Sequence, residues 1–255
     1  MVDRTFVVGD IHGDLSALRK VLARMPQPDA EDTLVFLGDY LDRGPDSAGV
    51  VDFILNVLPQ HTPARIVTLR GNHEDAWVKV MAGEWPDFVM PPANGCLQTM
   101  QSFLGEPVSP PGTSASFEQL QALVAAEFFP PSVTRWLEGL PHYYEDDHAI
   151  YVHAGLPITP TGGFVHPGDA VGKQLVALLW IRDQRFFRDY RGKTVVVGHT
   201  GTSRLPPELS DYTPEDTTDL WYGPAVIGID TGAGKRGFLT ALELPAGIVY
   251  ESRGE

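Results

Sequence analysis

The feature that most constrains this chain is a short apolar run followed at once by glycine and metal-binding residue types. Phe6-Val7-Val8 leads into Gly9-Asp10-Ile11-His12-Gly13, in which Asp10 and His12 are two residues apart. On an extended backbone, side chains at that spacing point to the same side. The glycines permit the sharp turn that such a strand end needs. One Asp-x-His triplet is a weak signal, but the same design recurs four more times along the chain.

Helix and strand patterns alternate over the first third of the chain. Asp14 is the expected N-cap of a first helix and Ser47 that of a second. The alternation predicts a parallel βαβ core, whose sites form at the carboxyl ends of the strands. The expected elements are helices over 15–25 and 47–58 and buried strands over 33–37 and 65–69.

The rest of the chain divides into a middle segment and a second strand-rich part. Residues 83–135 are rich in proline and glycine, and we interpret them as an insertion or cap beside the site. We expect the segment 202–220 to be a surface loop and the chain to form one domain over 1–255. The further expected elements are helices near 97–104 and 117–127, strands at 149–152 and 194–197, and antiparallel strands at 225–229, 238–242 and 248–250 that close a second sheet.

The ends of five expected strands carry side chains that bind metals. These residues are Asp10 and His12, Asp39, Asn72 and His73, His153, and His199. Mixed imidazole and oxygen ligands suit Mn²⁺, Fe²⁺ or Zn²⁺, whereas Ca²⁺ prefers oxygen ligands alone. A single ion rarely takes that many protein ligands and leaves room for a substrate. The ligand set therefore favours two divalent ions.

Composition limits the class of partner. The 255 residues carry a net charge of −14, which argues against a dominant nucleic-acid or anionic-membrane surface. The N-terminus has no signal-peptide pattern, and no apolar stretch is long enough to span a bilayer. The single cysteine, Cys96, cannot form an internal disulfide and suits a reducing compartment. We expect a cytoplasmic protein with neither nucleic acid nor membrane as partner, and the pattern indicates no particular oligomeric state.

Five ordered motifs resemble those of the PPP family of metal-dependent phosphoprotein phosphatases, and of its short bacterial members in particular. They are GDIHG at 9–13, GDYLDRG at 38–44, RGNHE at 70–74, HAG at 153–155 and GHT at 198–200. LLWIR at 178–182 and GIDTGA at 228–233 extend the similarity over nearly the whole chain. The resemblance implies the α/β calcineurin-like metallophosphoesterase sandwich, in which helices flank two mixed β-sheets, with a helical and loop insertion in the middle.

The resemblance also implies how two ions would be held. Asp39 would bridge them, and a hydroxide shared by the ions would attack phosphorus in line with the leaving oxygen. We expect Mn²⁺, with Fe or Zn as alternatives. The implied ligands are Asp10 and His12 for the first ion and Asn72, His153 and His199 for the second.

Roles outside the metal ligands follow from the same resemblance. His73 would protonate the leaving oxygen, and Asp42 would orient His73. Arg43, Arg182 and Asn72 would bind the phosphoryl oxygens, a task that suits the planar arginine fork. Two alternatives remain: Asp42 as an ordinary turn residue and Arg182 as an ion-paired surface arginine.

The leading expectation for function is hydrolysis of phosphoserine and phosphothreonine monoesters in phosphorylated proteins or peptides. The alternative is symmetrical hydrolysis of dinucleoside polyphosphates such as diadenosine tetraphosphate, or of other small phosphoesters. The resemblance favours the protein phosphatases because symmetrical tetraphosphatases usually lack the aspartate found here as Asp42. A nuclease or cyclic phosphodiesterase is less consistent with the sequence, because Gly198-His199-Thr200-Gly201 lacks the second histidine of their final motif.

Overall fold

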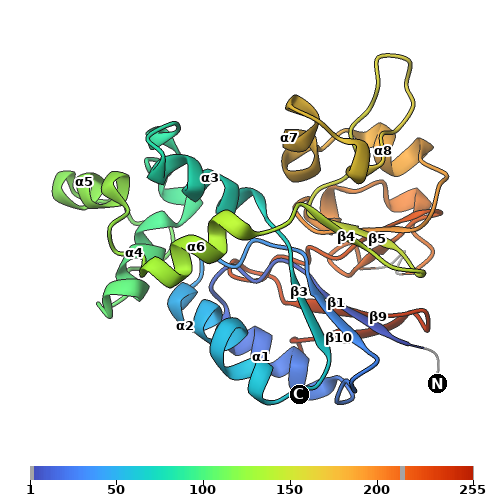
Figure 1. The fold of residues 1–255 in the computed structure, drawn as a ribbon, viewed down its shortest axis with the longest axis horizontal. Helices are drawn as coiled ribbons and strands as arrows, with labels where there is room; N and C mark the ends of the chain where they lie inside the picture. The colour runs from blue at the N-terminus through green and yellow to red at the C-terminus, as the bar shows by residue number, and fades with distance from the viewer. Residues whose placement is uncertain (1–2, 213–215, 255) are drawn as a thin grey trace.

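Two five-stranded β-sheets packed face to face form the centre of the molecule, and helices cover their outer faces (Figure 1). The computed structural model describes residues 3–212 and 216–254. The layers therefore run helix, sheet, sheet, helix. This arrangement confirms the expected α/β sandwich of two mixed sheets.

Each sheet combines parallel and antiparallel strands. In the first sheet, β1, β2 and β3 are parallel, while β9 and β10 are antiparallel to their neighbours. In the second, β5, β6 and β8 are parallel, and β4 and β7 run antiparallel at the edges. In spatial order the first sheet is β10 (Ile248–Glu251), β9 (Thr240–Leu244), β1 (Thr5–Val8), β2 (Thr33–Phe36) and β3 (Arg65–Thr68). The second is β4 (Tyr143–Glu145), β5 (Ile150–Val152), β6 (Val195–Val197), β8 (Val226–Gly228) and β7 (Trp221–Tyr222).

The prediction that the last three apolar runs all close the second sheet was wrong. Only β8 lies there, and it pairs parallel with β6. β9 pairs antiparallel with β1, which places Leu242 opposite Val7. An apolar run specifies a buried strand but not its partner, because the partner is selected by packing between distant segments. Here Leu242 and Leu244 are buried between the two sheets.

The alternation of side chains along each strand separates three apolar layers. Phe6 and Val8 point toward the helices that cover the first sheet, whereas Val7 points between the sheets. On the second sheet, Val195 and Val197 likewise point toward the covering helices, while Val196 points into the layer between the sheets. Both faces of each central strand are thus buried, as its nearly continuous apolar sequence predicts.

Two helices follow β1 and β2. Asp14 accepts a hydrogen bond from the Ala17 N–H at 2.9 Å, so it caps the first helix as predicted. The N-cap of the second helix is Asp46 rather than Ser47, because the Asp46 carboxylate accepts from the Gly49 N–H at 2.8 Å. The helices are α1 (Leu15–Arg24), α2 (Ser47–Asp52), α3 (Asn72–Met81), α4 (Cys96–Leu104), α5 (Phe117–Ala125), α6 (Pro131–Gly139), α7 (Lys173–Trp180) and α8 (Gln184–Asp189).

The middle segment is more helical than its proline content indicates. Its predicted helices are present as α4 and α5, but α6 was missed because Pro130 and Pro131 read as breakers. Proline at the first turn of a helix costs no hydrogen bond, so Pro131 starts α6 instead. Helices α5 and α6 pack against α3, and α4 packs against α2 and α5, so these helices lie together on the left of Figure 1. The segment 202–220, which we expected to be a surface loop, contains two short 3₁₀ turns, Thr202–Arg204 and Pro207–Leu209. Its residues 213–215 lie outside the described residues.

The topology brings the motif loops to one region. The strands β1, β2, β3, β5 and β6 end just before the motifs GDIHG, GDYLDRG, RGNHE, HAG and GHT, respectively, and β8 ends at the first residue of GIDTGA. No helix within residues 3–212 and 216–254 has both the length and the apolar character needed to cross a bilayer.

Candidate metal and phosphate-binding site

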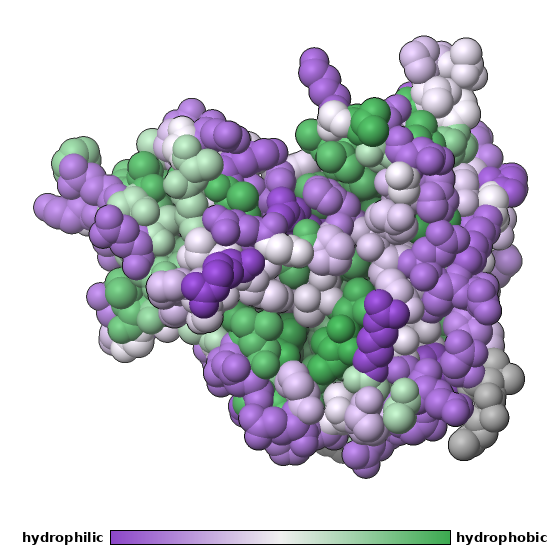
Figure 2. Space-filling view, viewed as in Figure 1, coloured by the Kyte–Doolittle hydropathy of each residue, from purple (hydrophilic) through white to green (hydrophobic). Residues whose placement is uncertain are grey.

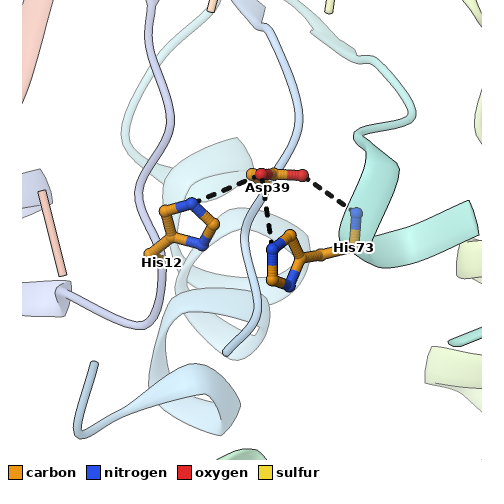
Figure 3. Close-up of side chains that lie close together, drawn as sticks. All are labelled: His12, Asp39 and His73. Atoms are coloured by element: carbon orange, nitrogen blue, oxygen red, sulfur yellow. Dashed lines mark hydrogen bonds and ion pairs between the residues drawn. The ribbon is translucent and has the colours of Figure 1, made fainter. Parts of the chain in front are cut away.

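Asp39 lies at the centre of the site and faces several histidines. Its Oδ2 is 3.3 Å from Nε2 of His12 and 4.0 Å from Nε2 of His73 (Figure 3). Its Oδ1 is 3.4 Å from Nε2 of His153 and accepts the His73 backbone N–H at 3.1 Å (Figure 3 draws the latter bond). The two oxygens of one carboxylate therefore face two different groups of imidazoles, as a bridging ligand requires.

The other predicted ligands complete both groups. Asp10, Asp39 and His153 place potential ligand atoms within 4.8 Å of one another, and so do His12, Asp39 and His73. Asn72 Oδ1 lies 3.0 Å from Nε2 of His153. It also lies 2.7 Å from Nδ1 of His199. All six residues predicted as ligands are thus brought together, and His73 lies within the same cluster.

Backbone carbonyls fix the orientation of two imidazoles. Nδ1 of His12 donates to the Leu41 carbonyl at 2.9 Å, and Nδ1 of His153 donates to the Leu37 carbonyl at 2.9 Å. A histidine that uses Nδ1–H in this way keeps its Nε2 lone pair for a metal. Both Nε2 atoms point toward Asp39.

Burial favours the chemical states that a divalent cation needs. Burial, followed by His153 and Arg182, lowers the pKa of His199 to about 2, and its buried Nε2 has no hydrogen-bond partner among residues 3–212 and 216–254. Burial also lowers the pKa of His12 and of His153, so these imidazoles are neutral at pH 7. Burial and the nearby Asp230 and Asp39 raise the pKa of Asp10. Neutral imidazoles beside crowded buried carboxylates form a donor set that fits divalent metal ions.

Strained backbone is concentrated in this site. Six described residues other than glycine have positive φ, and five of them are predicted site residues. Each such conformation costs about 1–3 kcal/mol and persists where surrounding structure enforces it, which is typical of functional sites. The five are His12, Asp39, Asp42, Arg43 and His199, with φ between 49° and 72°.

Glu74 holds the two central loops against each other. Its carboxylate accepts backbone N–H bonds from Asp39 at 2.8 Å, Tyr40 at 2.9 Å and Gly71 at 3.1 Å. Burial and the neighbouring Asp39 raise the pKa of Glu74 to about 8. A side chain at Gly71 has no room, because its Cβ would lie 2.2 Å from the Asp39 nitrogen. Glu74 therefore supports the loop.

Asp42 contacts His73 and is itself held by two neighbours. Its Oδ2 lies 2.6 Å from Nδ1 of His73. Its Oδ1 accepts from Thr99 Oγ1 at 2.6 Å and from Trp77 Nε1 at 3.0 Å. All four side chains are buried, and the Phe88 ring packs edge-on against His73 at 5.4 Å between centroids. Thr99 and Phe88 of the middle segment thus line the pocket of this acid pair.

The predicted phosphate-binding arginines occupy different environments. Arg43 contacts Nε2 of His12 through Nη1 and lies 3.0 Å from Nε2 of His73 through Nη2. Arg182 is exposed and lines a cavity of about 470 Å³ together with Arg43 and His199. It has no ion pair within the described residues, which disfavours the alternative of an ion-paired surface arginine. Arg70 donates to the Leu137 and Glu138 carbonyls and so belongs to the framework.

Several residues of the site were missed by sequence reasoning. Asp230 adjoins Asp10 and follows β8, so the rule that strand ends carry ligands could have indicated it. Lys235, in a glycine-rich loop, and Arg204, in a segment interpreted as surface loop, line the same cavity as Arg182. Thr99 gave no signal, because it reaches the site only through packing of α4.

Comparison with known proteins places these features in a family. The calcineurin-like phosphoesterase family matches residues 4–221. A serine/threonine-protein phosphatase SIT4 of Candida albicans is 39% identical over 80 residues, which cover 30% of this chain and 25% of that protein. A symmetrical bis(5'-nucleosyl)-tetraphosphatase of Pectobacterium carotovorum is 38% identical over 79 residues, which cover 31% of this chain and 26% of that protein. The matched segment thus spans about a quarter of each curated relative.

Solved structures agree with this placement at the level of the fold. A crystal structure of a protein provisionally described as a diadenosine tetraphosphatase superposes with a TM-score of 0.58 at 22% identity. It covers 97% of this chain, and the match covers 92% of that chain. The family match spans most of the sequence and includes the strand ends that carry the clustered Asp, Asn and His residues. The chain therefore belongs to the calcineurin-like phosphoesterase family and is a metallophosphoesterase.

Proposed function

We propose that this metallophosphoesterase is a phosphoprotein phosphatase that hydrolyses phosphoserine and phosphothreonine monoesters in the cytoplasm. The observation that carries the proposal is the buried pair of His73 and Asp42, whose atoms are 2.6 Å apart beside the metal-binding cluster. The alkoxide of serine or threonine is a strongly basic leaving group, so its departure benefits from a positioned acid. The similarity to a serine/threonine-protein phosphatase supports the same substrate class.

The residues fit two divalent ions, for which we propose Mn²⁺, with Fe or Zn as alternatives. When bound, such ions supply Lewis acidity toward the phosphoryl group and lower the pKa of a water molecule toward neutrality. Asp39 faces both groups of ligands and would be shared between the ions. The proposed ligands are Asp10 and His12 on one side and Asn72, His153 and His199 on the other.

His73 is the proposed general acid. Asp42 accepts from Nδ1–H, which fixes the ring and leaves Nε2 facing Asp39 and Arg43. When the phosphorus–oxygen bond breaks, a proton on Nε2 passes to the leaving oxygen and yields the serine or threonine hydroxyl. An arginine can only donate hydrogen bonds, so Nε2 accepts from Arg43 in the arrangement described here. His73 can carry the transferable proton once Arg43 turns to the substrate.

Arg43 and Arg182 are the proposed phosphate-binding residues, with the Asn72 amide as a third. Arg43 and Arg182 line one cavity beside His199, so both guanidinium groups can reach a phosphoryl group held there. The guanidinium of Arg43 lies against His12 and His73, on the side of the cluster where phosphoryl oxygens would lie. Paired N–H donors match the spacing of phosphoryl oxygens.

A second candidate is hydrolysis of dinucleoside polyphosphates. It is favoured by the similarity to a symmetrical bis(5'-nucleosyl)-tetraphosphatase and by further basic residues in the cavity that holds Arg182. These cations could bind the phosphates that remain beyond the reacting one. The acid pair alone does not distinguish the two substrates, because a proton donor assists either leaving group.

The test is a direct comparison of substrates. The purified chain is stripped of metal, reloaded with Mn²⁺, Fe²⁺ or Zn²⁺, and supplied with phosphoserine peptides or diadenosine tetraphosphate. We expect phosphopeptide hydrolysis to dominate. His73→Asn should retain metal and lose rate on phosphopeptides, whereas Asp10→Asn should lose metal. Rapid cleavage of the dinucleotide with phosphopeptides untouched would reverse the order of the two candidates.

A further inference from the structure

A strongly basic cavity adjoins the metal-binding cluster of this acidic protein. The chain has a net charge of −14, yet the cavity of about 470 Å³ next to His199 is lined mainly by cationic and small hydroxyl side chains. A concave basic site in a low-dielectric wall concentrates anions even when the molecule as a whole repels them. The cations on its wall are Arg43, Arg182, Arg204, Lys235, Arg236 and Arg253.

The cations of this cavity differ in whether carboxylates neutralise them. Arg253 pairs with Asp216, Asp219 and Glu251, each at 2.7 Å. In contrast, four other cations form no ion pair with any carboxylate of residues 3–212 or 216–254. These four are Arg182, Arg204, Lys235 and Arg236. Arg182 is already assigned to the reacting phosphate, which leaves three cations without a role.

The loop that carries Lys235 is fixed beside the metal-binding cluster. Gly234 has φ +70, and a Cβ there would lie 2.3 Å from the carbonyl oxygen of His12. Gly237 is packed equally closely against the Thr231 carbonyl. Burial, followed by the nearby Arg43, lowers the pKa of Lys235, and the carboxylates of Asp230, Asp10 and Asp39 oppose this shift. The loop therefore presents Lys235 and Arg236 to the cavity from a rigid base.

The wall chemistry favours an anion over a nucleobase. Apart from the imidazole of His199, which belongs to the metal-binding cluster, Phe238 is the one aromatic side chain among the lining residues that the structure describes. It is buried, and the Arg253 guanidinium covers its ring at 4.0 Å from the centroid. Nucleobases commonly stack on an exposed aromatic face, and an arginine guanidinium can also serve as the stacking surface. Ser203 instead offers a hydroxyl group that can donate to an anion, whereas Thr202 and Thr218 donate theirs to the Thr218 carbonyl and to Asp216.

We propose that Arg204, Lys235 and Arg236 form a second anion subsite that selects phosphopeptides with a further acidic group near the scissile phosphate. The group is a second phosphate or a carboxylate of the same peptide. The proposal rests on the proposed function, because it assumes that the reacting phosphate lies at Arg43 and Arg182. It assigns the cavity beyond the metal ions to substrate selection rather than to the chemical step.

The experiment compares matched phosphopeptides on the Mn²⁺-loaded full chain. Each peptide has one phosphoserine, and the neighbouring positions carry neutral residues, aspartate or a second phosphoserine in turn. The variant is Arg204→Gln with Lys235→Gln, and the control is Lys20→Gln with Arg135→Gln, which removes the same charge at exposed positions outside the cavity. Equilibrium binding of the acidic peptide to the metal-stripped chain provides a readout that does not depend on turnover.

We expect the wild-type chain to prefer the acidic peptides, with kcat/KM about fivefold lower for the neutral one, the size of an exposed charge interaction. The cavity variant should lose this preference and bind the acidic peptide more weakly, whereas the control should keep both. Raising the salt concentration should reduce the wild-type preference. Lys235→Arg, which keeps the charge, should behave like the wild type and so separates loss of charge from loss of fold.

Different failures have different meanings. If all phosphopeptides are cleaved equally by the wild type and the cavity variant, the second subsite does not exist and the proposed function stands. If diadenosine tetraphosphate, rather than any acidic peptide, loses rate in the cavity variant, the cavity binds polyphosphate and the peptide assignment is overturned. If no phosphopeptide is cleaved, the proposed function fails, and the subsite assignment fails with it.

Discussion

Thr99 and Asp42 exchange two hydrogen bonds across the boundary between the middle segment and the GDYLDRG loop. Thr99 Oγ1 donates to Asp42 Oδ1 at 2.6 Å, and the Asp42 backbone N–H reaches Thr99 Oγ1 at 2.9 Å. Because Asp42 also orients His73, the position of α4 is coupled to that of the proposed acid. The middle segment is therefore part of the site's framework.

Replacing Thr99 tests this coupling. Thr99→Val keeps the shape but leaves a buried carboxylate oxygen with one partner fewer, so we expect a loss of about 1–3 kcal/mol in the free energy of unfolding. Phosphopeptide turnover should fall while metal content stays constant. Urea unfolding, turnover and metal analysis check the three effects. Thr217→Val, at an exposed position, is the matched control. Unchanged turnover would show that the position of α4 does not affect the acid pair of Asp42 and His73.

Asp42→Asn tests the acid pair through the leaving group. Without the carboxylate, His73 loses the partner that holds its ring in place, so turnover of phosphoserine peptides should fall by about 10²–10⁴-fold. An aryl phosphate, whose leaving group needs little protonation, should be affected far less. Steady-state kinetics on both substrates measure the contrast, with Asp147→Asn as an exposed control. Equal losses on the two substrates would contradict the role of His73 as acid.

Metal removal should lower stability as well as activity. Ions that bind only the folded chain stabilise it by about 2.7 kcal/mol when present at 100 times their dissociation constant. Chelation should therefore lower Tm, and restoring Mn²⁺ should recover it. Asp10→Asn should bind metal at least about tenfold more weakly and show a smaller Tm response. Calorimetry and metal analysis provide the measurements. A Tm that is the same before and after chelation would argue against bound ions at this cluster.

An ion pair between Arg4 and Asp32, far from the metal-binding cluster, predicts that the stability of the fold depends on pH. Asp32 Oδ2 accepts from Arg4 Nη2 at 2.6 Å. Burial opposes ionisation of Asp32, but its hydrogen bonds, chiefly from Arg4, outweigh burial and lower its pKa. A depressed folded pKa adds stability above the unfolded value of about 3.9, and this stability is lost as pH falls through the folded pKa.

Asp32→Asn should therefore cost about 1 kcal/mol at neutral pH, and the difference from wild type should shrink as the medium becomes acidic. Urea unfolding over a pH series measures this, with Asp147→Asn as the control at an exposed position. A cost that stays constant down to acidic pH would show that Asp32 acts through packing alone.

Short-range patterns predicted much of the fold. Apolar runs such as 33–37 and the Asp14 cap lie within a few residues of the structure that they specify, so propensity and capping chemistry suffice. The cap at Asp46 was missed because the neighbouring Ser47 offered the same capping signal, and the helix starting at Pro131 was missed because its prolines read as helix breakers. Those errors concern boundaries and local choices, not the architecture.

The sequence by itself determined which residue types stand at the strand ends, and hence a metallophosphoesterase with Asp39 among its central residues. Only the tertiary structure decided that β9 and β10 join the first sheet, that Thr99 and Trp77 hold Asp42, and that Lys235 lies in a cavity with Arg204. Strand partners and cavity walls join residues far apart in the chain. Such contacts depend on how whole layers pack, and no local pattern records that packing.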